Sequence, residues 1–153
     1  PNVVGVPATH GVILDFFKKL IATPERLDIL GDGSQKKSYL HVSELINAMV
    51  FISTLENETD SARIVNVGCD DAGILVSDIA RIVTSVYSPN AKLKFGKTNR
   101  GWTGDVPKFC YDISYLKSLG WEPKLTSHEA VQKAAFEINN QLDLGVRLEK
   151  PNR

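Results

Sequence analysis

Residues 29–44, ILGDGSQKKSYLHVSE, decide the fold that we expect for the rest of the chain. Their apolar start runs into a turn at residues 31–33, where the glycines tolerate positive φ. Two lysines follow, and then the alternating run YLHV at residues 39–42. This order predicts a β-hairpin with a strand on each side of the turn, followed by a helix whose N-cap is Ser43.

The length and charge of the chain indicate a single domain. The 153 residues are 42% hydrophobic, which is enough to bury a core. The 18 basic and 18 acidic residues cancel, so the net charge suggests neither nucleic acid nor a membrane surface as a partner. The two cysteines lack metal-ligand spacing, and no apolar run approaches the roughly 20 residues of a membrane span. We therefore expect a cytoplasmic protein, and the missing initiator Met suggests that a segment precedes Pro1.

The hydrophobic pattern predicts a mixed α/β fold with few strands. Helical spacing is found at residues 12–21, 44–55, 77–86, 114–119 and 127–142. Strands are predicted at residues 26–30, 39–42, 63–67 and 92–95. Ser127 with Glu129 is the predicted cap of the last helix, and Gly145 is its predicted end. Residues 96–107 form a long predicted loop and are therefore a functional candidate.

Two segments place cations beside glycines, where main-chain amides can also approach a phosphate. One is Lys36-Lys37 and the other is NRGW at residues 99–102. Taken alone, each of these segments is most simply explained as charged surface exposed to solvent. His10 and His41 are better explained as packed or hydrogen-bonded residues than as acid–base groups.

Other motifs favour structure over chemistry. Asp70-Asp71 is most simply a turn, and Trp121 a core anchor. The sequence contains no GxxGxxG turn, no Tyr-x-x-x-Lys pair, no GxSxG and no HExxH. The residues by themselves therefore indicate no catalytic machinery.

An ordered set of motifs resembles the carboxyl-terminal half of the extended short-chain dehydrogenase/reductases. The motifs are NVVG, THGVILDF, ILGDGSQKKSYLHVSE, IVNVGCD and RGWTGDVPKFCYDISYLKSLGWEPK. They are most similar to NAD-dependent nucleoside-diphosphate-sugar epimerases of the UDP-glucose 4-epimerase type, over residues 2–137. The resemblance implies a small substrate-binding α/β domain at residues 1–145, with residual Rossmann-domain elements near its N-terminus but the Rossmann NAD-binding half missing. It also implies a frayed tail at residues 146–153.

The same resemblance implies a substrate site. Asn2 matches an asparagine that reaches the sugar diphosphate, Lys37 stands where a diphosphate-binding arginine is usual, and Arg100 matches a second arginine. Lysine cannot make the planar two-pronged contact of arginine. The implied substrate-binding residues are Asn2, Gly11, Val12, Ile13, Lys37, Tyr39, Arg100 and Asp105, with residues 11–13 beside the nucleobase. The resemblance implies no catalytic, cofactor-binding or metal-binding residue on this chain.

The implied function is that of a carboxyl-terminal substrate-binding fragment of an epimerase, inactive alone. The full-length protein would use NAD to oxidise a sugar carbon transiently, bind a UDP-sugar and form a homodimer. Three alternatives stay open at this point. They are a dehydratase or reductase of the same family, a non-catalytic nucleotide-sugar-binding module, and a structural domain without a ligand.

Overall fold

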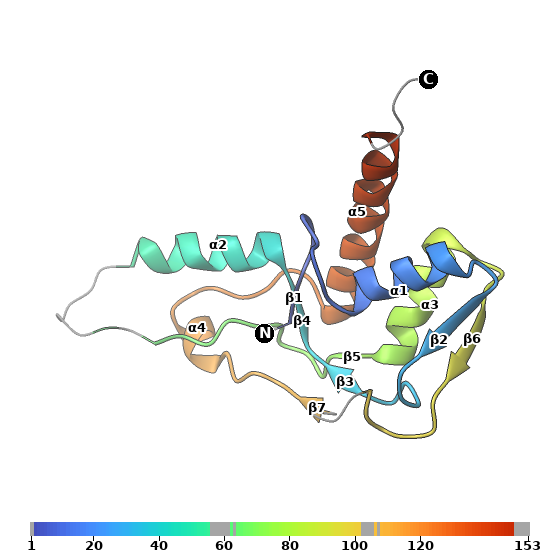
Figure 1. Ribbon diagram of the computed structural model, residues 1–153. Helices are drawn as coiled ribbons and strands as arrows, with labels where there is room; N and C mark the ends of the chain where they lie inside the picture. The colour runs from blue at the N-terminus through green and yellow to red at the C-terminus, as the bar shows by residue number, and fades with distance from the viewer. Residues whose placement is uncertain (1, 56–61, 63, 102–105, 107, 149–153) are drawn as a thin grey trace.

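Three helices form the main body of the protein in the computed structural model, which describes residues 2–55, 62, 64–101, 106 and 108–148. Helices α1 (Val12–Ala22), α3 (Val76–Tyr87) and α5 (Ser127–Leu148) pack against one another (Figure 1). Helix α2 (Val42–Ser53) points away from them, and the short helix α4 (Ser114–Ser118) lies on the α2 side of the molecule. No described helix is both long and apolar enough to cross a membrane.

The described strands form three small sheets. They are β1 (Asn2–Val4), β2 (Arg26–Ile29), β3 (Lys36–Lys37), β4 (Tyr39–His41), β5 (Ile74–Leu75), β6 (Lys92–Phe95) and β7 (Lys108–Phe109). Strand β1 pairs in parallel with β4, and β2 in parallel with β6. Strand β3 lies between antiparallel β5 and parallel β7. Parallel pairs joined through helices are typical of α/β architecture.

The predicted hairpin at residues 29–44 is wrong. Gly31 and Gly33 do adopt positive φ, at 78° and 80°. Asp32 accepts a hydrogen bond from the main-chain N–H of Ser34 at 2.8 Å and another from the Ser34 hydroxyl, and these bonds lower the pKa of the Asp32 carboxyl. The chain thus turns as predicted, but β2 pairs with β6, and β3 and β4 enter two other sheets. A turn sequence specifies a reversal locally, whereas strand pairing depends on distant partners.

Two predicted details near α2 also need correction. The N-cap is His41, whose ring accepts from the main-chain N–H of Ser43 at 3.2 Å, so the helix begins before Ser43. Residues 64–67 form no strand, and the side chain of Ile64 is exposed.

The ends of α5 differ from the prediction at both termini. The cap is a reciprocal pair in which Thr126 N–H donates to Glu129 Oε2 at 2.8 Å and Glu129 N–H donates to Thr126 Oγ1 at 3.3 Å. Ser127 has a different role, described below. The helix continues past Gly145 to Leu148, and residues 149–153 of the expected tail lie outside the described residues.

Apolar periodicity predicted the main core correctly. Helix α1 buries the face that contains Ile13, Phe17 and Leu20, and α3 buries Ile79 and Val83 against it. A second, smaller cluster joins α2 to the segment after α4, where Trp121 is buried as expected. Its indole N–H donates to Asn47 Oδ1 at 2.8 Å, which satisfies the one polar atom of the ring.

Replacing Phe17 by alanine tests this core. Phe17 is completely buried, so Phe17→Ala should lower the free energy of unfolding by about 3–5 kcal/mol. Phe136→Ala is the matched control, because Phe136 lies on α5 with 62% of its surface exposed, and it should change that free energy by no more than about 0.5 kcal/mol. Urea unfolding followed by circular dichroism measures both, and equal effects would contradict the assigned core.

Candidate functional site

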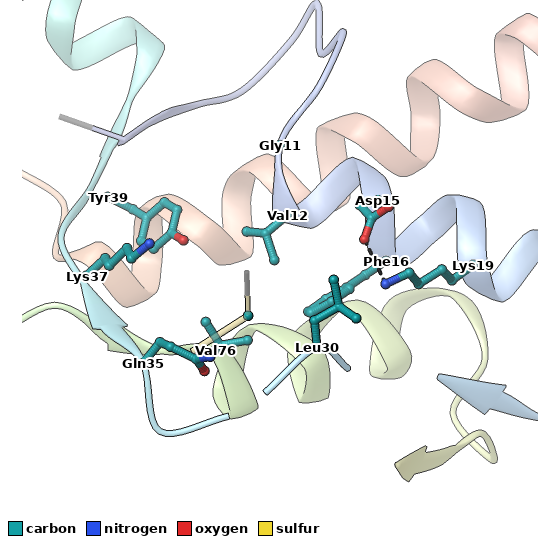
Figure 2. Close-up of a pocket in the computed structure, with 11 residues that line it drawn as sticks. Gly11, Val12, Asp15, Phe16, Lys19, Leu30, Gln35, Lys37, Tyr39 and Val76 are labelled. Atoms are coloured by element: carbon teal, nitrogen blue, oxygen red, sulfur yellow. Dashed lines mark ion pairs between the residues drawn. The ribbon is translucent and has the colours of Figure 1, made fainter. Parts of the chain in front are cut away.

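Two adjoining hollows lie around the start of α1. The α1 cavity, of about 300 Å³, is lined from α1 by Gly11, Val12, Asp15, Phe16 and Lys19, and from elsewhere by Leu30, Gln35, Lys37, Tyr39, Val76 and Gly101. Figure 2 shows these side chains around the hollow. The loop cavity, of about 480 Å³, lies along β1, the loop at residues 5–11 and the start of α1, and also touches Ile138 of α5. Gly11, Val12, Lys37 and Tyr39 line both cavities, so the two adjoin at these residues, and we refer to them together as the joined cavities.

Strand β4 holds Tyr39 at the junction of the two cavities. Its main-chain N–H donates to Ser127 Oγ at 3.0 Å, and its main-chain oxygen accepts from the Cys69 thiol at 2.7 Å. Asn2 faces Tyr39 in the register of β1 and β4, and its amide donates to the main-chain oxygen of Ser38 at 3.3 Å. The main chain on which Tyr39 sits is therefore fixed from several directions.

Strand β3 holds Lys37. It pairs with Ile74 of β5 and with Phe109 of β7. The turn before β5 contains Gly73, with φ at 81°, and a Cβ at this position would collide with the main-chain carbonyl of Lys37. The close approach of the turn to β3 thus requires glycine at this position.

Asp71 connects the segment that holds Tyr39 with the turn that packs against Lys37. One of its oxygens accepts from Gly73 N–H at 2.8 Å and from the Ser127 hydroxyl at 2.7 Å, and the other accepts from Ser127 N–H. The hydroxyl oxygen of Ser127 in turn accepts a hydrogen bond from the main-chain N–H of Tyr39. Asp70-Asp71 is therefore a turn, as the sequence indicated, and Asp71 also positions the start of α5.

The loop at residues 96–101 packs against the turn at residues 31–33. The main-chain N–H of Asp32 donates to the main-chain oxygen of Thr98 at 2.7 Å. The Thr98 hydroxyl in turn donates to the main-chain oxygen of Arg100 at 2.8 Å. Gly101 lines the α1 cavity, whereas Arg100 lines neither cavity. Asp105 lies outside the described residues.

The structure thus brings together most of the residues that the sequence suggested. Those lining the joined cavities are Asn2, Gly11, Val12, Ile13, Lys37 and Tyr39. Sequence reasoning missed the wall formed by Phe16 and Leu30 and the ion pair between Asp15 and Lys19. Helical spacing gave a signal for Asp15 and Lys19, because residues four apart lie on one face of a helix.

The two histidines that sequence reasoning assigned to structure have hydrogen-bond partners. His41 is buried, its Nε2 lies 2.9 Å from Glu137 Oε2, and its Nδ1 lies 2.7 Å from Ser43 Oγ. His10 is exposed, with Nδ1 3.0 Å from Thr9 Oγ1. Among the described residues, His, Cys, Asp and Glu form no group of three able to hold a metal ion.

The two cysteines differ strongly in their surroundings. Burial raises the pKa of the Cys69 thiol to about 11, and its proton is donated to the main-chain oxygen of Tyr39. Cys110 is exposed. The Cys69 thiol therefore supports the cavity as a protonated donor.

The parallel strand pairs and the helices packed with them make this an α/β protein. The sequence model of the NAD dependent epimerase/dehydratase family matches residues 1–68. The chain belongs to the NAD-dependent epimerase/dehydratase family.

Comparisons with individual proteins agree with this family. A crystal structure of UDP-galactose 4-epimerase is 35% identical, with a TM-score of 0.77, over 92% of this chain and 44% of that one. UDP-glucuronic acid decarboxylase 1 of Arabidopsis thaliana is 30% identical over 118 residues, which are 76% of this chain and 25% of the relative. Putative GDP-L-fucose synthase 2 of the same plant is 30% identical over 105 residues, 69% of this chain and 30% of the relative. The chain thus spans less than half the length of each.

The family match corrects two expectations. It covers residues 1–68, in the Rossmann-like, NAD-binding region of the family, so the identification as a carboxyl-terminal substrate-binding domain without the Rossmann half is wrong. The expectation that this chain has no share in the cofactor region conflicts with the same match. The parallel pairing of β1 with β4 is compatible with a Rossmann-like sheet.

Alkylation tests the assigned state of Cys69. Iodoacetamide at pH 8 should label Cys110 within minutes and leave Cys69 unlabelled, because the thiolate is the nucleophile and the Cys69 pKa is raised. Peptide mass spectrometry measures the labelling, and in urea both cysteines should react. Equal labelling of the folded protein would contradict the buried, hydrogen-bonded thiol.

Proposed function

We propose that the joined cavities bind a nucleoside-diphosphate-sugar, with a UDP-sugar as substrate, and that the chain serves an epimerase reaction of the UDP-glucose 4-epimerase type. The main support is the position of Lys37, which lines both cavities at their junction together with Tyr39. Solved homologues bind UDP-sugars. The cavity sizes suit a ligand of this class, since binding sites for small molecules commonly enclose about 300–1,000 Å³.

The residues of the chain divide the binding task by their chemistry. The Lys37 ammonium is a point charge suited to a diphosphate, and the Asn2 amide can donate beside it. Helix α1 begins at the same place, and its N-cap Gly11 provides no side-chain hydrogen bond to the first turn. The unpaired N–H groups of a helix start favour an anion. Val12 and Phe16 offer apolar surface for a base or sugar ring.

The residues of this chain do not fit a complete NAD site. A dinucleotide cradle in this fold needs a GxxGxxG-type turn between a strand and a helix, and the sequence contains none. We therefore derive no reaction step through NAD. What the chain supplies is binding and orientation of the sugar nucleotide.

Calorimetric titration with UDP and UDP-glucose tests the binding proposal. The wild-type chain should release heat, and Lys37→Ala should weaken binding about tenfold or more, because it removes a charged hydrogen-bond donor. Lys36→Ala is the matched control, since Lys36 precedes Lys37 on β3 and lines neither cavity. Absence of heat with the wild-type chain would overturn the proposal, and so would equal effects of the two substitutions.

An activity assay tests the division of labour. The chain incubated with NAD and UDP-glucose should form no UDP-galactose, because its sequence has no Tyr-x-x-x-Lys pair to exchange protons with the sugar. Chromatography of the nucleotide-sugars after overnight incubation measures this. Formation of UDP-galactose would contradict the proposed role, and formation of a dehydrated or reduced sugar would assign the chain to another reaction of the family.

A further inference from the structure

A serine, a histidine and a carboxylate are joined by hydrogen bonds where α2 leaves the main body of the protein (Figure 1). Ser43 lies in the first turn of α2, and its Oγ is 2.7 Å from His41 Nδ1. The other ring nitrogen, Nε2, is 2.9 Å from Glu137 Oε2 on α5. Ser43 is exposed, whereas the side chain of His41 is only 2% exposed. Ser43 lines neither cavity, so these three residues are separate from the proposed nucleotide-sugar site.

The main chain determines which nitrogen of the neutral His41 ring carries the proton. The main-chain N–H of Ser43 donates to Nδ1 at 3.2 Å, so Nδ1 is the acceptor and Nε2 bears the hydrogen. The Nε2–H then donates to Glu137, and the lone pair of Nδ1 also faces the Ser43 hydroxyl. In this arrangement a histidine can take the proton of a nucleophile while a carboxylate orients the ring.

Lys133 of α5 brings a positive charge to the same place. Its Nζ lies 3.4 Å from Ser43 Oγ and 3.4 Å from His41 Nδ1. An ammonium at this distance favours negative charge on oxygen, whether on Ser43 or on a carbonyl that Ser43 attacks. The Glu137 carboxylate favours the imidazolium that forms when the ring takes the proton. The two charges therefore lie where acyl transfer to Ser43 would need them.

Three other exposed serines lack a basic partner. The hydroxyls of Ser53, Ser85 and Ser118 each donate to the main-chain oxygen three residues earlier in the same helix. A main-chain carbonyl accepts a hydrogen bond but does not take the proton, so these hydroxyls stay weak nucleophiles. Ser53 lies on α2, as Ser43 does, and is therefore a matched comparison within the same chain.

We propose that Ser43 is a nucleophilic site that activated carboxylic esters acylate, with His41 as its base. Ser43 Oγ attacks the carbonyl carbon of the ester while its proton passes to His41 Nδ1. The bond between that carbon and the leaving oxygen breaks, and the leaving alcohol takes the proton from Nδ1. Ser43 then carries the acyl group as an ester, and no further reactant is needed. Glu137 is a positioning residue, because it acts through the His41 ring.

Site-resolved labelling of the wild-type chain tests this inference. The probes are a fluorophosphonate, which phosphonylates a nucleophilic serine with release of HF, and p-nitrophenyl acetate, which acetylates it with release of p-nitrophenol. Ser43 should react with both at least about hundredfold faster than Ser53, because a general base contributes a factor of this size. Peptide mass spectrometry measures the label on each serine. Equal labelling of the two serines, or no label on Ser43, overturns the inference.

Variants separate the base from its structural role as a helix cap. His41→Asn removes the base but keeps a preferred N-cap residue, and it should lower the labelling rate of Ser43 to that of Ser53. Glu137→Gln keeps an acceptor for the Nε2–H without the charge, so it should slow labelling about tenfold or more, whereas a purely structural contact would leave the rate unchanged. Ser53→Ala should leave the labelling of Ser43 unchanged.

Circular dichroism establishes that each variant is folded. Wild-type labelling rates of Ser43 in folded His41→Asn overturn the inference, because the proposed base is then absent. The comparison of Ser43 with Ser53 in the wild-type chain needs no variant, so it decides the question even where a substitution at the buried His41 prevents folding.

Discussion

The hydrogen bonds of the Asp71 carboxylate hold together the parts of the chain that surround the cavities. The two oxygens accept from the main chain and hydroxyl of Ser127 and from the main chain of Gly73. Through Ser127 the carboxylate reaches the N–H of Tyr39 on β4, and through Gly73 it sets the turn that presses against Lys37 on β3. Strands β3 and β4 belong to different sheets, and the half-buried Asp71 carboxylate links the positions of both. Hydrogen bonds to an ionised acceptor are strong enough for this.

A second carboxylate repeats the same device beside α2. Glu44 is almost fully buried in the first turn of that helix, and it accepts from the main chain of Lys124 at 2.6 Å and of Leu125 at 3.3 Å. Leu125 precedes α5, and its main-chain oxygen lies 3.6 Å from the Cys69 sulfur. The segment that leads into α5 is thus bound to α2 on one side and to the turn at Asp71 on the other. Because β3 has only two residues and β4 three, their positions depend on these side chains more than on sheet pairing.

The helices could be predicted from the sequence, whereas the strand pairing could not. Periodic apolar residues specify which face of α1 or α3 is buried, and this information is local. The partner of β2 is β6, more than sixty residues away in sequence, and a turn at residues 31–33 is compatible with either partner. Most of the cavity residues were predicted from the family resemblance that the ordered motifs carry. No single motif showed a chemistry that would have identified them. Phe16 looked like an ordinary core residue of a helix, and only the fold shows that it also forms the floor of a cavity.

The start of α1 shows why the site and the fold are connected at one point. Gly11 has φ at 103°, and no atom lies within 4 Å of the position where its Cβ would be. Glycine is therefore needed for its backbone conformation, not to avoid crowding. Glycine has no side chain that could cap the helix, and the helix begins at the junction of the two cavities, which Lys37 also lines. Under the proposed function, a phosphate at this junction would take the place of the missing capping group, so that binding the ligand would also complete the helix.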